Sequence, residues 1–302
     1  MSQFHPDLAF VARLLPRFAF GPRIIKLSRL FAREAGPPRS TPGIDASLRA
    51  IPGGGTARVF TPTGITAPTP AMLWVHGGGF IVGSPAQDDA VATMFARELG
   101  ITVVAPSYRL APEHPFPAAI DDLFAALTWL HASADALRVR PDRIVVAGAS
   151  AGGGLAAGLT LLARDRQVPV AFQHLVYPML DDRTVGRTID GANHRIWTAR
   201  SNRFGWTSYL GREPDTDDLP IYAAPARAES LAGLPPTWIG VGTFDLFHDE
   251  DVAYARRLAA AGVPVELEVV PGVFHAFDRF ARAGVAKSFA AKQVAALRRA
   301  LA

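Results

Sequence analysis

Residues 143–164, RIVVAGASAGGGLAAGLTLLAR, carry the clearest indication of the fold expected for this chain. Residues 143–147 form a short β-branched apolar run, as expected of a strand buried on both faces. From residue 153 onward, apolar side chains recur at helical spacing. The five residues around Ser150, Gly-Ala-Ser-Ala-Gly, form a G-x-S-x-G turn, which exposes a serine at the carboxyl end of a strand. The stretch therefore predicts a strand, a tight turn and a helix.

Taken alone, this stretch has three interpretations. Ser150 is a nucleophile, with the N–H of Ala151 pointing at the oxygen that becomes negative when the serine attacks a carbonyl. Alternatively, Gly152-x-Gly154-x-x-Ala157 is a loose dinucleotide-binding fingerprint after a strand. In the third, the glycines simply let the helix pack closely against the strand. All three stay open on this stretch alone.

A glycine-rich loop favours the first interpretation. His76-Gly77-Gly78-Gly79-Phe80 directly follows an apolar run at residues 71–75. Three successive glycines leave bare backbone N–H groups free to converge on an anion, as in the oxyanion loop of lipases and esterases. A dinucleotide-binding fold has no use for such a loop, so we expect Ser150 to act in a hydrolase.

A serine nucleophile needs a base and an orienting acid, in the chain order serine, acid, histidine. Asp245 follows the apolar run 237–241, and His275 follows the run 265–270. Because the carboxyl ends of parallel strands meet at one edge of the sheet, both side chains are expected to lie near Ser150.

Other acidic side chains are expected to be structural. Asp249, Glu250 and Asp251 open a predicted helix, where carboxylates complement the free N–H groups and the dipole. Two acidic pairs are weak metal candidates, namely Asp88-Asp89 and Asp181-Asp182. We expect no metal and no cofactor.

The rest of the chain alternates apolar runs with helical stretches, which predicts an α/β fold with a mostly parallel sheet. Strands are predicted at 71–75, 102–105, 143–147, 171–177, 237–241 and 265–270. Helices are predicted at 85–99, 117–131, 153–164, 249–261 and 284–301. Residues 36–55, rich in Pro, Gly and Ser, are expected to form a loop.

Two segments stand outside this alternation. Residues 181–234 show no strand pattern and carry the aromatics Trp197, Phe204, Trp206 and Tyr209, which predicts a largely helical insertion. Such an insertion often forms a lid or a substrate pocket. The structural interpretation is that the aromatics simply anchor it to the core. Near the N-terminus, Phe4, Leu8, Val11 and Leu15 recur at helical spacing, which predicts a short amphipathic helix that packs on the same chain.

Composition narrows the classes of partner and location. The 302 residues include 31 Lys and Arg against 27 Asp and Glu, and the basic residues are scattered without a cationic block. We therefore expect no nucleic-acid partner. The absence of Cys excludes disulfides and a cysteine nucleophile. No signal peptide or transmembrane run is evident, so we expect no stable membrane insertion and a cytoplasmic location.

The motifs together resemble the bacterial hormone-sensitive lipase family of α/β-hydrolase carboxylesterases, from about Val59 to Phe277. They are the loop at His76, the Tyr-Arg-Leu-Ala-Pro-Glu-His-Pro-Phe-Pro run that begins at Tyr108, the turn at Ser150, the segment from Asp245 through Asp249-Glu250, and His275-Ala-Phe. The resemblance implies that Ser150 is the nucleophile, His275 the general base and Asp245 its orienting acid. It further implies that the N–H groups of Gly78, Gly79 and Ala151 form the oxyanion hole, supported by His76 and Gly77.

The resemblance also implies a domain layout and an activity. Residues 1–45 and 181–234 form a helical cap, and residues 46–180 and 235–302 form the α/β-hydrolase core. The expected activity is hydrolysis of short- to medium-chain acyl esters, small-molecule substrates, through an acyl-enzyme intermediate. The alternative is a ligand-binding protein on the same fold without catalysis. A homodimer is a further expectation.

Two residues depart from the family pattern. The family usually has Asp at the position of Ala149 and Pro at the position of Leu246. Neither change removes a member of the triad, but the first alters the hydrogen bonds near Ser150 and the second the turn after Asp245.

Overall fold

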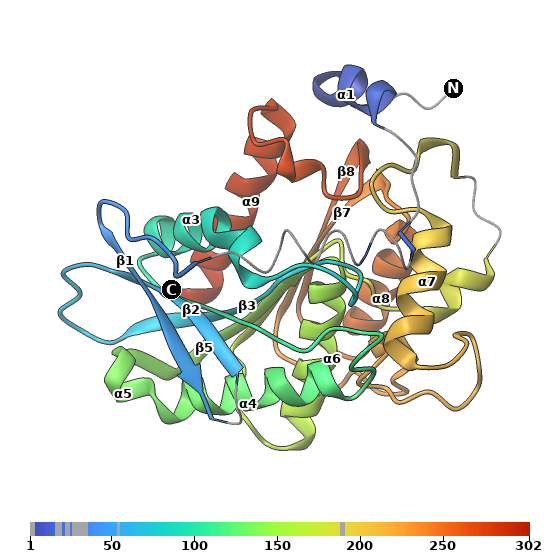
Figure 1. Ribbon diagram of the computed structural model, residues 1–302. Coiled ribbons are helices and arrows are strands. Elements are labelled where there is room, and N and C mark those ends of the chain that lie inside the picture. Colours follow the sequence, from blue (N-terminus) through green and yellow to red (C-terminus); the bar gives the residue numbers. More distant parts are fainter. Residues whose placement is uncertain (1–3, 16–19, 22–24, 26–35, 53–54, 188–190) are drawn as a thin grey trace.

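The computed structural model describes residues 4–15, 20–21, 25, 36–52, 55–187 and 191–302. In this part of the chain, eight strands form one sheet, in the order β1-β2-β4-β3-β5-β6-β7-β8 (Figure 1). The strands are β1 (Ile44–Ile51), β2 (Gly55–Pro62), β3 (Thr69–Val75), β4 (Thr102–Pro106), β5 (Val139–Ala149), β6 (Phe172–Val176), β7 (Thr237–Phe244) and β8 (Val265–Phe274). The strands from β4 to β8 pair in parallel, whereas β1 and β2 are antiparallel to their neighbours. The α/β-hydrolase fold expected from the sequence is therefore confirmed.

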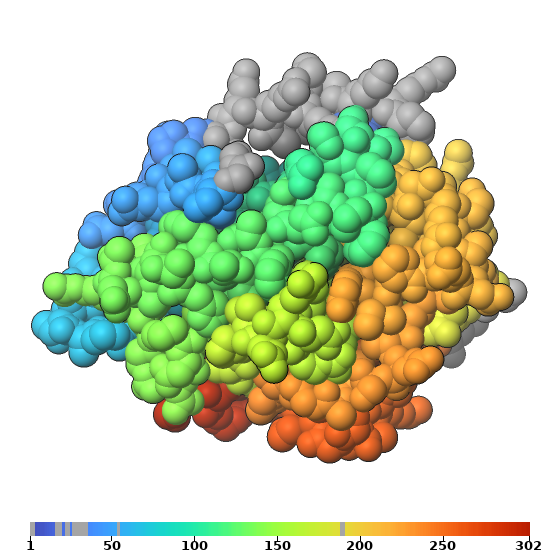
Figure 2. Space-filling view, turned by 90° about the horizontal axis from the view of Figure 1, so that it is seen from below, coloured from blue at the N-terminus to red at the C-terminus, as the bar shows by residue number. Residues whose placement is uncertain are grey.

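Helices cover both faces of the sheet. The α-helices described are α1 (Ala9–Leu14), α3 (Asp89–Leu99), α4 (Ala118–Ala132), α5 (Ala134–Leu137), α6 (Ala151–Asp165), α7 (Ala199–Leu210), α8 (His248–Ala260) and α9 (Gly284–Leu301). Helices α3 and α9 lie together on one face, and α4 and α6 on the other (Figure 1). Figure 2 views the molecule from the side of α4, whose green surface adjoins the yellow and orange surface of the inserted segment.

Successive side chains of the central strands point to opposite faces of the sheet. In β5, Val145 packs toward the α3 and α9 side, and Val146 toward the α4 and α6 side. The same division separates Met72 and Trp74 from Leu73 and Val75 in β3. This period of two follows from the pleat, and it explains why these strands read as unbroken apolar runs.

One expectation about the N-terminal half is wrong. Residues 36–55 were expected to form a loop, but β1 occupies residues 44–51 within it. Only its end residues, Ile44 and Ile51, are buried. An edge strand with so few buried side chains needs no alternating apolar pattern, because backbone hydrogen bonds to β2 hold it in place.

The first helix packs as its spacing predicts. Leu8 and Ala12 are buried, and the ring of Phe4 lies edge-on to Phe244 and Phe274, at 5.3 and 6.2 Å between centroids. The expected N-terminal cap at residues 1–45 also includes residues 1–3, 16–19, 22–24 and 26–35, which lie outside the described residues.

The topology brings four chain segments to one edge of the sheet. The glycine-rich loop follows β3, Ser150 follows β5, Asp245 follows β7 and His275 follows β8. These are carboxyl ends of parallel strands, the edge at which open α/β sheets bind their ligands.

Candidate active site

Ser150 occupies a strained turn between β5 and α6. Its backbone has φ 58° and ψ −125°, a region that L-residues rarely adopt. The surrounding chain holds this geometry: the N–H of Ser150 donates to the carbonyl of Val176 at 2.9 Å, and its own carbonyl accepts from Met179 at 3.0 Å. The serine is thus presented at the sheet edge, as the G-x-S-x-G pattern predicts.

The glycines around this turn are required by close packing. A Cβ at Gly148 would lie 2.3 Å from the carbonyl oxygen of Gly152, and one at Gly152 would lie 2.2 Å from that of Val75. A Cβ at Gly154 would lie 2.0 Å from the carbonyl oxygen of Met179. The close-packing interpretation is therefore correct for these glycines, and it is compatible with a nucleophile at Ser150.

Three side chains predicted from separate segments meet at the turn. His275 Nε2 lies 2.9 Å from Ser150 Oγ, and His275 Nδ1 lies 2.8 Å from Asp245 Oδ2. The other oxygen of Asp245 accepts the N–H of Phe247 at 3.0 Å, which fixes the carboxylate. All three are buried, with Ser150 the most accessible at 8% exposure. This arrangement can move a proton from a serine to an imidazole that a carboxylate holds in one tautomer.

Two aromatic rings that no sequence motif indicates pack against the imidazole. Tyr177 and Phe247 lie edge-on to His275, at 4.8 and 5.2 Å between centroids. Tyr177 follows β6 and Phe247 precedes α8, so both stand at the same sheet edge as the triad. Their position could be found only from the topology, because neither belongs to a recognisable short motif.

The glycine-rich loop passes directly over the serine. A Cβ at Gly77 would lie 2.8 Å from the carbonyl oxygen of Ala149 and 3.2 Å from Ser150 Cβ. Among the described residues, the N–H groups of Gly78, Gly79 and Ala151 donate to no other group. They therefore keep their hydrogen-bonding capacity for a ligand beside Ser150.

His76 stabilises the base of this loop. Its ring stacks on Tyr108 at 4.3 Å between centroids, and its Nδ1 lies 2.8 Å from the carbonyl oxygen of Gly77. The hydroxyl of Tyr108 donates to the carbonyl of His76 at 2.8 Å. Burial lowers the pKa of His76 below its ordinary value, which keeps the imidazole neutral at physiological pH.

The insertion at residues 181–234 reaches this loop through Trp197. A Cβ at Gly79 would lie only 2.0 Å from Trp197 Cη2, so the indole packs directly on that glycine. Phe20 of the N-terminal segment lies 5.6 Å from Trp197 between ring centroids, and its N–H donates to Ser201 Oγ. The two expected cap segments thus contact each other, and Trp197 of the insertion contacts the glycine-rich loop.

The aromatics of α7 anchor the insertion to the core. Trp206 and Tyr209 are buried, and Tyr209 stacks on Phe80 at 4.1 Å between centroids. Phe204 is partly buried against the same core. The structural interpretation of these side chains is therefore correct.

Glu250 differs from its expected role as a solvated helix-end charge. It is 2% exposed, and one of its oxygens accepts the N–H groups of Leu180 and Asp181, at 2.7 and 3.1 Å. Its other oxygen contacts the hydroxyl of Thr184. Burial raises the pKa of Glu250 to about 8. Glu250 therefore ties α8 to the point where the insertion leaves the core.

The other two acids at the start of α8 differ in burial. Asp251 is fully buried, with its pKa raised well above the ordinary value by burial and by the nearby Glu250 and Asp245. Asp249 is exposed and forms a 2.7 Å contact with His248, as expected of a helix-end charge.

The acidic pairs that were weighed as metal candidates are bound to arginines. Asp88 contacts Arg279 and Asp89 contacts Arg58, both at 2.6 Å. In the second pair, Asp181 and Asp182 form ion pairs with side chains of the insertion, namely Arg183, Arg187 and Arg227. In the part of the chain that the structure describes, no group of three potential ligands could hold a metal ion.

The two departures from the family pattern leave the triad in place. Leu246 is buried, and the bond from the N–H of Phe247 closes the turn after Asp245 without a proline. Ala149 is buried and lines a cavity between α3 and α9 that the glycine-rich loop does not line.

The fold and the activities of its relatives define a carboxylic ester hydrolase. The chain belongs to the α/β-hydrolase fold family, whose model matches residues 72–279. The resemblance to hormone-sensitive lipase-like esterases is confirmed by its relatives.

Two curated relatives come from Mycobacterium tuberculosis. Carboxylesterase NlhH is 39% identical over 250 residues, which are 81% of this chain and 78% of NlhH. Carboxylic ester hydrolase LipN is 38% identical over 245 residues, which are 78% of this chain and 64% of LipN.

Solved structures agree with these relatives. A bacterial heroin esterase superposes with a TM-score of 0.90 at 39% identity, covering 99% of this chain and 98% of the esterase. The esterase LipW from Mycobacterium marinum superposes with a TM-score of 0.86 at 32% identity, covering 99% and 96% of the two chains. These similarities favour an enzyme over a ligand-binding protein on the same fold.

Proposed function

We propose that this protein hydrolyses short- to medium-chain carboxylic esters by a serine mechanism with an acyl-enzyme intermediate. The observation that carries the proposal is the continuous chain of contacts from Asp245 through His275 to Ser150, at 2.8 and 2.9 Å. Activated serine nucleophiles have this arrangement of nucleophile, base and orienting acid.

In the first half of the reaction, Ser150 Oγ attacks the ester carbonyl and His275 Nε2 takes the serine proton. Asp245 holds the proton on Nδ1 and stabilises the imidazolium. The tetrahedral intermediate then collapses, the imidazolium gives its proton to the leaving alcohol, and the acyl group stays on Ser150. In the second half, His275 takes a proton from water as the water oxygen attacks the acyl-enzyme carbonyl. The second tetrahedral intermediate then collapses, the imidazolium returns its proton to Ser150 Oγ, and the carboxylic acid is released.

The oxyanion of each tetrahedral intermediate would be stabilised by the N–H groups of Gly78, Gly79 and Ala151. Their availability among the described residues and their position around Ser150 support this role. Donors fixed in this way need no reorganisation when the negative charge develops.

The expected preference for short acyl chains follows from aromatic side chains beside the glycine-rich loop. Trp197 is packed on Gly79 and Phe20 lies beside it, so bulky side chains border the loop over Ser150. Such a border leaves room for small acyl groups and hinders long chains. We assign residues 1–45 and 181–234 to the cap and residues 46–180 and 235–302 to the core on the same basis.

Two measurements test the proposal. Initial rates with p-nitrophenyl esters from acetyl to palmitoyl should peak at short or medium chains and vanish in Ser150→Ala. Mass spectrometry after treatment with an organophosphate should find the phosphoryl group on Ser150. A folded wild-type protein that turns over no ester and takes no label would contradict the proposal.

Location and assembly stay predictions. In the described residues, no helix has the length and apolar character needed to cross a bilayer. A cytoplasmic location and a homodimer remain expectations from the sequence and the family resemblance.

A further inference from the structure

We propose that a second cavity, behind the nucleophile turn, binds a small carboxylate with an apolar body. It has a volume of about 310 Å³ and lies between α3, α9 and the segment after β8. This volume is at the lower end of the range of about 300–1,000 Å³ for small-molecule sites. The proposed reaction assigns it no role, because the triad and the glycine-rich loop do not line it.

The walls of the cavity are mostly apolar. They come from Trp74 of β3, from α3 and from α9, and include Val91, Met94, Phe95, Ala286 and Ala290. Small alanines on α9 and long side chains on α3 leave the space between the two helices. A hydrocarbon body of a few carbons would replace water against this surface, which is the main favourable term for such a ligand.

One end of the cavity is polar, and its charges determine the ligand class. The hydroxyl of Tyr177 donates to Asp278 at 2.7 Å, and Arg279 contacts Asp88 at 2.6 Å. Lys287 has no side-chain partner in the described part of the chain. Lys287 is exposed at the rim. The lining thus carries two cations, Arg279 and Lys287, against one acid, Asp278, which favours an anionic end group over a cationic one.

The cavity touches the back of the proposed active site. Ala149, which directly precedes Ser150 in the chain, forms part of its wall, and so does Tyr177. The Tyr177 ring is the one that lies 4.8 Å from the ring of His275. A ligand in the cavity would therefore contact two residues that adjoin the triad without reaching the triad itself.

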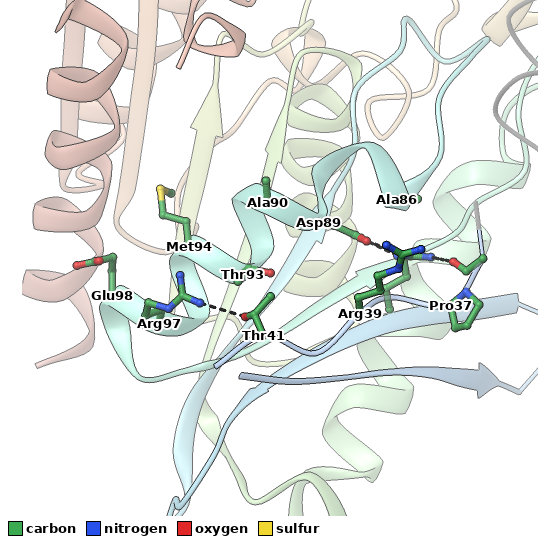
Figure 3. Close-up of a pocket in the computed structure, with 12 residues that line it drawn as sticks. Pro37, Arg39, Thr41, Ala86, Asp89, Ala90, Thr93, Met94, Arg97 and Glu98 are labelled. Carbon is green, nitrogen blue, oxygen red and sulfur yellow. Dashed lines mark hydrogen bonds and ion pairs between the residues drawn. The ribbon is translucent and has the colours of Figure 1, made fainter. Parts of the chain in front are cut away.

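A neighbouring pocket is a weaker candidate. It has a volume of about 650 Å³, lies on the outer side of α3 and shares Ala90 and Met94 with the cavity (Figure 3). Its buried cation Arg58 is already held by Asp89, and Arg97 donates to Thr41. That pocket is not lined by Ala149 or Tyr177, so of the two only the cavity adjoins residues next to the triad.

The test is isothermal titration calorimetry with sodium hexanoate on protein whose Ser150 has been blocked by an organophosphate. We expect saturable binding to the blocked protein. Ala290→Phe fills the cavity and should weaken binding by about tenfold or more, whereas Ala291→Phe, on the exposed side of the same helix, should not change it. Lys287→Gln should weaken hexanoate binding by about threefold, the scale of one exposed ion pair, and leave hexanol binding unchanged.

Each outcome decides the proposal. Loss of binding on blocking Ser150 would mean that hexanoate binds the active site alone, and equal binding by the two phenylalanine variants would place it outside the cavity. Either result overturns the proposal. The test of whether hexanoate binds in the cavity does not depend on the proposed reaction. If the organophosphate fails to label Ser150, the two phenylalanine variants can be compared in unblocked protein. If the protein is an esterase, occupancy should change kcat at saturating acetyl ester, where competition by hexanoate at the active site is overcome. An unchanged kcat at saturation would refute the contact between ligand and active site.

Discussion

Replacing Gly79 by alanine tests the oxyanion hole through a single methyl group. Gly79 has φ +60°, and a Cβ there would lie 2.0 Å from Trp197 Cη2 and 2.8 Å from two other atoms of the indole. Ordinary contact begins near 3.4 Å, so the loop or the indole must move by more than 1 Å. Trp197 is 4% exposed and has little free space, which favours movement of the loop.

The expected cost follows from this displacement. Removal of one oxyanion donor lowers kcat by about 10²–10³-fold, and misplacement by about 1 Å can cost about 10²-fold. We therefore expect Gly79→Ala to lower kcat for p-nitrophenyl butyrate by about 10²-fold, with a smaller change in KM. The positive φ adds a loss of stability of about 1–2 kcal/mol, because an alanine is strained in this region.

A matched variant separates the strain from the collision. Gly100 has φ +65°, close to that of Gly79, but a Cβ there meets nothing within 4 Å. Gly100→Ala should show a similar loss of stability in urea unfolding and a wild-type kcat. In Gly79→Ala, the further change Trp197→Leu removes the colliding ring atoms and should restore part of kcat relative to Trp197→Leu alone. Wild-type kcat in Gly79→Ala would refute the assignment of Gly79 as a donor held by Trp197.

Four further predictions concern the triad and two buried groups. In a p-nitrophenyl butyrate assay, Ser150→Ala should lower kcat by about 10⁴–10⁶-fold and Asp245→Asn by about 10³–10⁴-fold. Both variants should keep the wild-type melting temperature. Activity near wild type in either variant would contradict the role assigned to that residue. Burial lowers the pKa of His174 to about 4, so the unfolded state takes up a proton near pH 6.5 before the folded state does. The free energy of unfolding should therefore fall by up to about 3 kcal/mol as the pH drops from 6.5 toward 4. Urea unfolding at pH 7 and pH 4.5 should show a smaller fall in His174→Gln, and an equal fall would exclude His174 as the cause. Because the pKa of Glu250 is raised to about 8, its ionisation should destabilise the fold as the pH rises from 4.5 through 8. Glu250→Gln should therefore gain stability relative to wild type between pH 5 and pH 9, and a constant difference would argue against a buried neutral Glu250.

The sequence predicts those elements whose local residue pattern follows directly from their place in the fold. The strands β3, β4, β6 and β7 and the second half of β5 are largely buried on both faces, so their apolar runs identify them without knowledge of their partners. The turn at Ser150 is predictable for a similar reason, since its backbone geometry demands glycine neighbours wherever it occurs. By contrast, β1 depends on hydrogen bonds to β2 and buries only two side chains, which leaves no local signal.

The contacts that complete the site could not be predicted, because they join residues far apart in the sequence that belong to no recognisable motif. Trp197 contacts a glycine more than a hundred residues earlier, and nothing in its own sequence neighbourhood indicates that contact. Three successive acids at the start of a helix indicate exposed charges that complement its N-terminus, yet Glu250 and Asp251 are buried and only Asp249 is exposed. Asp249 and Glu250 differ in burial. The burial of Glu250 depends on how the insertion packs on the core, and the local sequence does not encode that packing. The triad is therefore readable from motifs, whereas the surroundings that shape its specificity are set by how the insertion and the N-terminal segment pack on it.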